Sequence, residues 1–368
     1  MIRIRFVMIG GFLGAGKTTA LARLAKFYQE RGQRVGLVTN DQAQNLVDTN
    51  NLRSQGLTVE EVPGACFCCR FDDLVGKIGA LTVHERPDVI LAEPVGSCTD
   101  LVATVVQPLK DLYGTKLSIA PYAVLFKPSH GRKILTQAAD AGFSPKAAYI
   151  FQKQLEEADA IVLNRLDELT PGQAEELSGL ISRQYRGVPL LRVSAKTGDG
   201  FAALTELLDQ DGAFGRRILD IDYDTYAEGE AELGWLNSSV RLTARQAFSL
   251  DDLLTELLGE LGRATRQAGG EVAHLKIIGL TDGTYAVANL VSNSSSVELS
   301  LPSGARVDEA DLIVNARVAI DPDWLQERVV AAIESACRSR GAAAEFRQSQ
   351  CLRPGRPTPT HRYAQPVG

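Results

Sequence analysis

The stretch "GFLGAGKT", residues 11–18, decides the fold. It fits the pattern G-x-x-x-x-G-K-[S/T] at every fixed position. The apolar run "IRFVMIG" precedes it, and "TTALARLAKFYQERG", with apolar residues at helical spacing, follows it. In this order of strand, glycine-rich loop and helix, backbone N–H groups and the helix N-terminus surround a phosphate. We therefore predict a phosphate-binding loop in a mostly parallel α/β sheet flanked by helices, because the flanking pattern disfavours a chance glycine-rich turn.

The loop also indicates which residues would hold a nucleoside triphosphate. Lys17 reaches the outer phosphates, the Thr18 hydroxyl ligates Mg²⁺, and backbone groups wrap the remaining oxygens. The predicted cofactor-binding residues of this P-loop NTPase fold are Gly11, Gly14, Ala15, Gly16, Lys17, Thr18 and Thr19.

Two later strand ends indicate the base. "ADAIVLNRLDEL", residues 158–169, ends an apolar strand in Asn164-Arg165-Leu166-Asp167, which resembles the N-K-x-D motif of GTPases with arginine in place of lysine. A carboxylate at Asp167 accepts hydrogen bonds from guanine that adenine does not offer. Ser194, Ala195 and Lys196 follow the next strand and are similar to the S-A-K loop of the same proteins. "NRLD" alone would also suit an ordinary helix start, but the pair after a P-loop predicts GTP.

Acidic residues end two further predicted strands. "RVGLVTND" ends in Asn40 and Asp41, and "PDVILAEPVG" contains Glu93 and Gly96. Ligands gather at the carboxyl ends of parallel strands, so these carboxylates would hold Mg²⁺ or orient the attacking water. We predict catalytic roles for Lys17, Asp41 and Glu93, although Asp41 would also suit a helix N-cap.

Three of the six cysteines lie in "VPGACFCCRF", residues 62–71. Cys66, Cys68 and Cys69 are too close in sequence for an unstrained disulfide, and thiolates are soft ligands suited to Zn²⁺ or Co²⁺. Three ligands leave a fourth position for a partner or for exchange. Cys98 is a candidate fourth ligand, and redox sensing is the alternative role of the cluster.

Composition limits the remaining functions. A formal net charge of −6 and a pI near 5.4 argue against a nucleic-acid binder. No run approaches the roughly 18 apolar residues of a membrane span. We expect a cytoplasmic protein, in which cysteines stay reduced and clusters of them more often bind metal than form disulfides.

Taken together, "GFLGAGKT", "TND", C-x-C-C, E-x-x-G, Q-x-x-x-A-D-x-I-V-L-N-x-x-D and "SAK" resemble the CobW, HypB and UreG family of P-loop GTPases, closest to CobW. The resemblance implies a GTP-hydrolysing metallochaperone whose partner is a client metalloprotein or cofactor-assembly protein, with a possible homodimer. It implies that Asp41 is the switch acid, that Glu93 and Gly96 form the second switch, and that Cys66, Cys68 and Cys69 are the ligands of a transition metal.

The sequence departs from this family pattern in two places, and two other functions stay open. Pro94 stands in the second switch, where small hydroxyl residues are usual in the family. A histidine-rich tract is replaced by four scattered histidines, His84, His130, His274 and His361. One alternative is a GTPase gatekeeper of a corrinoid or other metalloenzyme. The other is a P-loop kinase, which the "NRLD" and "SAK" pair disfavours.

Changes of composition along the chain divide it into four parts. We predict a GTPase domain over 1–212, a connector over 213–232, a smaller C-terminal α/β domain over 233–342, and a disordered proline-rich tail over 343–368. The C-terminal part reads as strand, helix, strands and helix. The resemblance implies that this domain helps to choose the client.

Overall fold

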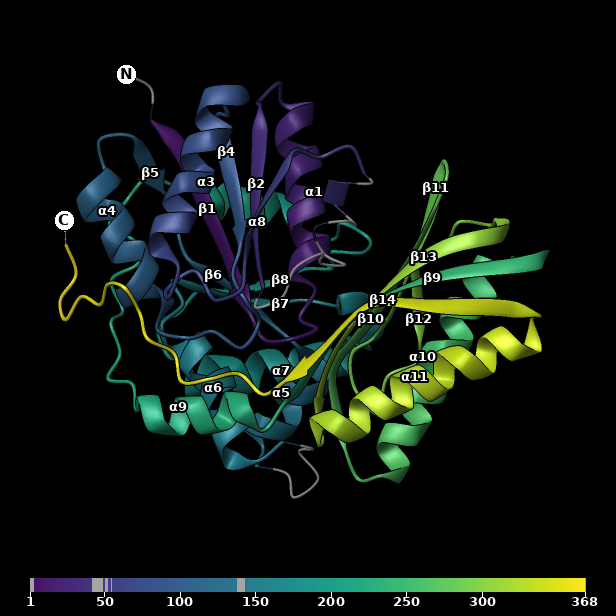
Figure 1. Cartoon of the computed structure of the whole chain (residues 1–368). Coiled ribbons are helices and arrows are strands. Elements are labelled where there is room, and N and C mark those ends of the chain that lie inside the picture. The colour runs from purple at the N-terminus through teal and green to yellow at the C-terminus, as the bar shows by residue number, and fades with distance from the viewer. Residues whose placement is uncertain (1–2, 42–48, 50–51, 54, 138–142, 368) are drawn as a thin grey trace.

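The computed structural model describes residues 3–41, 49, 52–53, 55–137 and 143–367. Two sheets organise the chain, one in each domain (Figure 1). The first has the strand order β3-β2-β4-β1-β6-β7-β8, with β5 also paired to β1, and every pairing described in it is parallel. The predicted fold class is therefore confirmed for the N-terminal domain.

The strands of the first sheet are β1 (Ile4–Gly11), β2 (Val35–Asp41), β3 (Val59–Pro63), β4 (Val89–Glu93), β5 (Leu117–Ile119), β6 (Ala123–Phe126), β7 (Ala160–Leu163) and β8 (Leu190–Arg192). The helices of this domain are α1 (Lys17–Glu30), α3 (Phe71–His84), α4 (Gln107–Tyr113), α5 (Pro128–Leu135), α6 (Pro145–Glu156), α7 (Pro171–Gln184), α8 (Phe201–Leu208) and α9 (Tyr223–Ala231). Two short helical turns, η1 (Val102–Val106) and η2 (Leu166–Glu168), complete it.

Helices on both faces of the first sheet explain why its central strands are apolar throughout. In β1, Phe6 and Met8 contribute to one core, while Val7 and Ile9 contribute to the core on the opposite face. This alternation follows from the two-residue period of a strand, and burial on both faces is typical of parallel sheets. The sheet therefore presents its ligand-binding residues at strand ends, where the loops begin.

The second sheet is antiparallel, with the strand order β12-β11-β10-β13-β9-β14. Its elements are β9 (Gly234–Ser249), α10 (Leu250–Gln267), β10 (Glu271–Thr281), β11 (Thr284–Leu290), β12 (Glu298–Leu301), β13 (Arg306–Ala319), α11 (Pro322–Ser339) and β14 (Ala342–Leu352). Helices α10 and α11 lie together on one face of the sheet (Figure 1). The predicted smaller C-terminal domain is confirmed as a separate helix-covered sheet.

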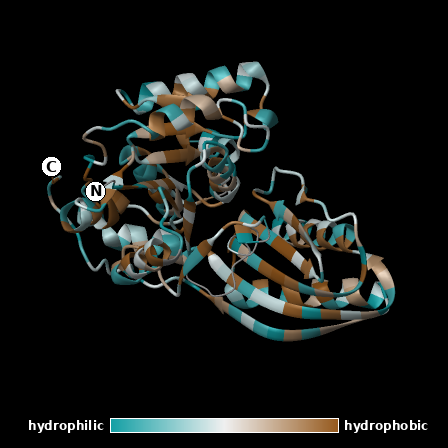
Figure 2. Cartoon of the chain, turned by 90° about the horizontal axis from the view of Figure 1, so that it is seen from above, coloured by the Kyte–Doolittle hydropathy of each residue, from teal (hydrophilic) through white to brown (hydrophobic). Residues whose placement is uncertain are grey.

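The two faces of this sheet differ in polarity, and the strands in Figure 2 are banded accordingly. In β10, Leu275 and Ile277 join the core beneath the helices, whereas His274 and Lys276 alternate with them. In β13, Val314 belongs to that core, while the neighbouring Asn315 is buried as a polar residue. One face is thus an ordinary core, and the other carries polar side chains toward the N-terminal domain.

The end of the chain departs from the expected tail. Residues 342–352 form β14, which pairs with β9 at the edge of the second sheet, so the predicted disorder from residue 343 is wrong for this segment. Only the first half of the strand carries an alternating face, in which Ala342, Ala344 and Phe346 pack against the core, and most of the second half is exposed, so pattern analysis missed the strand. β12, a four-residue edge strand, was also not anticipated.

The segment between the domains is partly helical. The expected connector over 213–232 contains α9, which packs on α6. Tyr226 of α9 and Trp235 at the start of β9 are both buried in the core of the N-terminal domain. Among the described residues, no helix is both long and apolar enough to cross a membrane.

Candidate functional site

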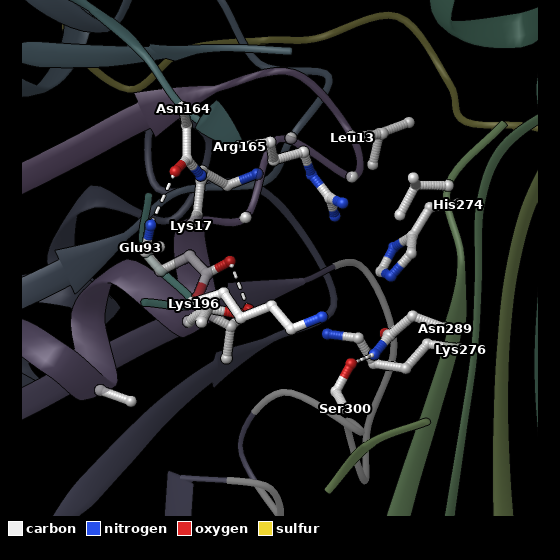
Figure 3. A pocket seen from close by; sticks show the side chains of 18 of the residues that line it. Leu13, Lys17, Glu93, Asn164, Arg165, Lys196, His274, Lys276, Asn289 and Ser300 are labelled. Atoms are coloured by element: carbon white, nitrogen blue, oxygen red, sulfur yellow. Dashed lines mark hydrogen bonds between the residues drawn. The ribbon is translucent and has the colours of Figure 1, made fainter. Parts of the chain in front are cut away.

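A cavity of about 370 Å³ lies between the phosphate-binding loop and the polar face of the second sheet (Figure 3). Most of the predicted nucleotide-site residues line it, namely Gly14, Gly16, Lys17, Thr18, Thr19, Glu93, Asn164, Asp167, Ala195 and Lys196. Three other predicted residues do not line the cavity but form hydrogen bonds with residues that do, namely Gly11, Ala15 and Ser194. The side chain of Asp41 lies outside the described part of the structure, so its predicted role stays a prediction.

The phosphate end of the cavity is built around Lys17. Its Nζ donates a hydrogen bond to the carbonyl oxygen of Gly11 at 3.0 Å. The side chain therefore folds back across the phosphate-binding loop. Gly16 has φ of 92°, and a Cβ there would lie 2.6 Å from Nδ2 of Asn164, so glycine is needed for both conformation and space. Gly96 is constrained by space alone, because a Cβ there would lie 2.9 Å from Nζ of Lys17 and 3.0 Å from the backbone nitrogen of Leu13.

Thr18 and Glu93 form a pair of oxygen ligands beside this lysine. Oγ1 of Thr18 donates to Oε1 of Glu93 at 3.1 Å, and both side chains line the cavity. A hydroxyl and a carboxylate at a phosphate site are the hard donors that Mg²⁺ prefers. These residues fit the ion that the sequence predicts.

The opposite end of the cavity holds the two predicted base-recognition segments together. Nδ2 of Asn164 donates to the carbonyl oxygen of Ala15 at 2.8 Å, and its Oδ1 accepts from the backbone N–H of Ala195 at 2.9 Å. Oγ of Ser194 donates to Oδ1 of Asp167 at 2.6 Å. Asn164 therefore joins the phosphate loop to the S-A-K segment, and Ser194 orients the carboxylate proposed to select guanine.

The C-terminal domain supplies the other wall, which the sequence analysis missed. His274, Lys276, Asn289 and Ser300 line the cavity from β10, β11 and β12, facing Lys17, Arg165 and Lys196 (Figure 3). Glu298 of β12 pairs with Lys196 at 2.6 Å and approaches Arg165 to 4.0 Å. The alternation of His274 and Lys276 with apolar neighbours was a usable signal, but it does not reveal what the polar face meets.

A buried lysine ties the two domains at this cavity. Lys127 follows β6, has 0% of its surface exposed, and donates to the carbonyl oxygens of Leu13 at 3.0 Å, Ala273 at 2.9 Å, and Val291. Burial lowers the pKa of Lys127 well below its ordinary value. One side chain thus connects the phosphate loop with two segments of the second sheet.

The three clustered thiols lie at another point of the same sheet edge, in the turn between β3 and α3. Sγ of Cys66 is 2.9 Å from that of Cys68 and 3.2 Å from that of Cys69, and the remaining pair is 3.8 Å apart. Four sulfurs around tetrahedral zinc are about 3.8 Å apart, since each Zn–S bond is about 2.3 Å. Small outward movements of Cys66 would therefore admit an ion.

The three thiols differ in environment. Cys66 and Cys68 are buried, whereas Cys69 is partly exposed. Hydrogen bonding between the thiol of Cys66 and those of Cys68 and Cys69 lowers the pKa of Cys66 well below its ordinary value. Because the thiolate is the form that binds metal, the lowered pKa suits Cys66 to the predicted role of metal ligand.

Asn40 connects the thiol turn to the nucleotide side of the sheet. Its Nδ2 donates to the carbonyl oxygens of Val62 at 2.8 Å and Ala65 at 2.7 Å, and its Oδ1 accepts from the backbone N–H of Phe67 at 2.7 Å. Asn40 also lines the nucleotide cavity. Sequence analysis placed Asn40 at the strand end but could not show that it holds the cysteine turn.

The last residues of the chain cover the thiol turn, where a disordered tail was expected. The segment after β14 runs back across the N-terminal domain (Figure 1). The backbone N–H of Thr360 donates to the carbonyl oxygen of Cys68 at 2.8 Å, and that of Thr358 donates to Sγ of Cys69 at 3.3 Å. Arg362 pairs with Asp100 at 2.7 Å farther along. The tail therefore contacts the thiol that is otherwise most open.

Comparison with known proteins agrees with this arrangement. The chain is 29% identical to the zinc chaperone YeiR of Escherichia coli (strain K12) over 178 residues, which are 46% of this chain and 49% of YeiR. It is 28% identical to the zinc chaperone CobW of Sinorhizobium sp over 221 residues, 55% of this chain and 62% of CobW. It is also 28% identical over 221 residues to the urease accessory protein UreG of Metallosphaera sedula, covering 56% of this chain and 93% of UreG.

The matched region spans half to about three fifths of the first two relatives. The family profile described as "CobW/HypB/UreG, nucleotide-binding domain" matches residues 5–191, just over half of the chain. This range contains the phosphate loop, the thiol turn and the Asn164 segment. The chain therefore belongs to the CobW/HypB/UreG family.

Proposed function

We propose that this protein is a GTP-hydrolysing metallochaperone. It binds Zn²⁺, or alternatively Co²⁺, through Cys66, Cys68 and Cys69, and delivers the metal to a client metalloprotein or cofactor-assembly protein. The observation that carries this proposal is the three-bond link from Asn40, which lines the nucleotide cavity, to the turn that bears the thiols. The relatives named as zinc chaperones support zinc as the cargo.

In this proposal the nucleotide side uses positioning and charge. Lys17 and the backbone of its loop hold the outer phosphates, and Asp167 accepts from guanine. Thr18 and Glu93 hold Mg²⁺, which supplies positive charge to the transferring phosphoryl group. The second sheet closes the cavity and limits access of water to it. Asp41 is proposed to orient the attacking water.

We propose that changes at the phosphates reach the thiols through Asn40, which lines the cavity and holds the thiol turn. Binding of GTP therefore alters metal affinity, and linkage requires metal to alter GTP affinity by the same factor.

We further propose a cytoplasmic location, where the thiols stay reduced. We also propose that the chain forms a homodimer, which light scattering would test.

The deciding experiment is metal analysis of the reduced protein purified anaerobically, with and without GTP. We expect about one zinc or cobalt ion per chain and loss of that ion when Cys66, Cys68 and Cys69 are replaced by serine. Retention of metal by the triple variant would remove the metal site. Transfer of labelled metal to a client distinguishes delivery from the gatekeeper function.

A further inference from the structure

The C-terminal tail, residues 353–367, runs from β14 back across the N-terminal domain and reaches the turn that carries the thiols (Figure 1). The backbone N–H of Thr360 donates to the carbonyl oxygen of Cys68 at 2.8 Å, and its hydroxyl donates to that of Cys69 at 3.3 Å. The backbone N–H of Thr358 donates to Sγ of Cys69 at 3.3 Å. A donor to a ligating sulfur orients the ligand and tunes metal affinity, so the tail forms an outer shell of the predicted metal site.

The same tail is anchored on the loop after β4, residues 94–100, which we call the β4 loop. Its last residue, Asp100, is only 1% exposed and has φ of 63°, in the left-handed region. Oδ2 of Asp100 accepts from Nε of Arg362 at 2.7 Å and from the hydroxyl of Tyr223 at 2.8 Å. Removing one partner of a buried ion pair leaves an uncompensated charge, so this contact holds the tail more firmly than an exposed pair does.

The other end of the β4 loop lies at the phosphate site. A Cβ on Gly96 would lie 2.9 Å from Nζ of Lys17, so the loop backbone packs directly against the ammonium group assigned to the phosphates. Nε2 of Gln154 donates to the carbonyl oxygens of both Gly96, at 2.9 Å, and Cys98, at 2.8 Å. One amide that binds two carbonyl groups of the loop makes it move as a unit. A shift of Gly96 is therefore carried toward Asp100.

We propose that residues 358–362 form a coupling strap between the nucleotide site and the metal site. The proposal rests on the proposed function, which supplies the nucleotide at one end and the metal at the other. Arg362 follows the β4 loop, and Thr360 and Thr358 pass its movement to the thiol turn. Thr360 and Arg362 are two residues apart, at most about 7 Å of extended chain, so the strap has little slack to absorb a shift of Asp100. Arg362 is thus a positioning residue for the metal site.

The test measures zinc affinity against a chelator, once with a nonhydrolysable GTP analogue bound and once with GDP bound. Coupled sites typically show a ratio of about 5 to 150 between two such states. In Arg362→Ala the ratio should fall toward one, by about threefold or more. Asp100→Asn should lower it as well, and asparagine suits the left-handed backbone, so this variant guards against a general loss of folding. Arg353→Ala is the matched control, because it removes another tail arginine, which approaches Asp321 to 3.9 Å, and should keep the full ratio.

A spectroscopic readout separates coupling from a merely structural role. Shortening the chain after Leu352 removes the Thr358 donor to Sγ of Cys69. A thiolate without that donor gives charge to the metal more readily, since a hydrogen bond from N–H stabilises the negative sulfur. The thiolate-to-cobalt absorption of the Co²⁺ complex should therefore move to longer wavelength. An absorption maximum that stays in place would remove the tail from the metal site.

The outcomes distinguish the strap from the proposed function. If the unaltered protein shows the ratio and both Arg362→Ala and Asp100→Asn keep it, the strap is overturned and the proposed function stands. If the unaltered protein binds zinc equally in the two states, or does not bind it, the proposed function is overturned together with the strap.

Discussion

The thiol cluster and the nucleotide cavity border the same sheet edge but are assembled in different ways. The thiols of Cys66, Cys68 and Cys69 come from one turn of the chain, closed by backbone hydrogen bonds from Cys69 and Arg70 to Cys66. The cavity takes its walls from strand ends of one domain and from strands β9 to β13 of the other. Substitutions at the domain interface should therefore weaken nucleotide binding more than metal binding. Changes to the C-terminal tail should affect the metal site more than the nucleotide site.

The largest effect is expected for Lys17→Ala. The variant removes a buried ammonium opposite the outer phosphates, and truncation of such a charge costs about 2–5 kcal/mol or more of binding free energy. GTP binding measured by calorimetry, and hydrolysis, should be lost. Zinc binding in the absence of nucleotide should persist, and its loss would contradict the separate assembly of the two sites.

Asp167→Asn should change which base is bound. The carboxylate that would accept from guanine becomes an amide that donates, and a charged hydrogen bond is worth about 1.5–3 kcal/mol. GTP affinity should fall and xanthosine triphosphate should bind better than GTP. The reference measurement is ATP competition with the unaltered protein, where ATP binding as tight as GTP binding would exclude the guanine assignment.

Lys127→Met tests the dependence of the cavity on domain docking. Methionine keeps an unbranched apolar stem but leaves three buried carbonyl oxygens without their donor, at about 1–3 kcal/mol for each buried unsatisfied group. The midpoint of thermal unfolding and GTP affinity should both fall while zinc binding is unchanged. Lys116→Met, at an exposed lysine, is the control. Equal losses in both variants would argue against the bridge.

The same interface should respond to acid through His130. Its Nε2 lies 2.9 Å from Oε1 of Glu271 in the other domain, and burial lowers the pKa of His130 from 6.5 to about 3. The unfolded chain then binds a proton that the folded chain does not. The contribution of neutral His130 to the free energy of unfolding is therefore fully present above pH 6.5. It falls as the pH drops toward 3, by at most about 1.4 kcal/mol per pH unit. Denaturant unfolding at several pH values should show a shallower decline in His130→Gln.

The smallest effect is expected when the tail is removed after Leu352. The deletion takes away the backbone donor of Thr358 to Sγ of Cys69 and the cover given by Thr360. Alkylation of Cys69, followed by mass spectrometry, should become several-fold faster, with GTP affinity unchanged. An unchanged rate would show that the tail does not limit access to the thiols.

Much of the candidate site could be predicted because its parts are contiguous in sequence. The phosphate loop needs glycines at fixed spacing, and "CFCC" places three thiols on one turn whatever surrounds them. The strands that carry Glu93 and Asn164 were recognisable because parallel strands covered on both faces are apolar throughout. Within the described structure, the phosphate loop, Glu93 and Asn164 do lie around one cavity, and the thiol turn lies beside it.

The contacts that join these parts depended on tertiary structure. Asn40, Lys127, Glu298 and Thr358 act on partners between 22 and 289 residues away in the chain. β14 is an exposed edge strand whose backbone pairing with β9 requires no apolar pattern. Local patterns report the burial and conformation of a residue, so the sequence by itself determined the chemistry of both sites. Only the tertiary structure decided which distant backbone groups each buried amide or ammonium hydrogen-bonds, because these groups meet only when the sheets, the two domains and the tail come together.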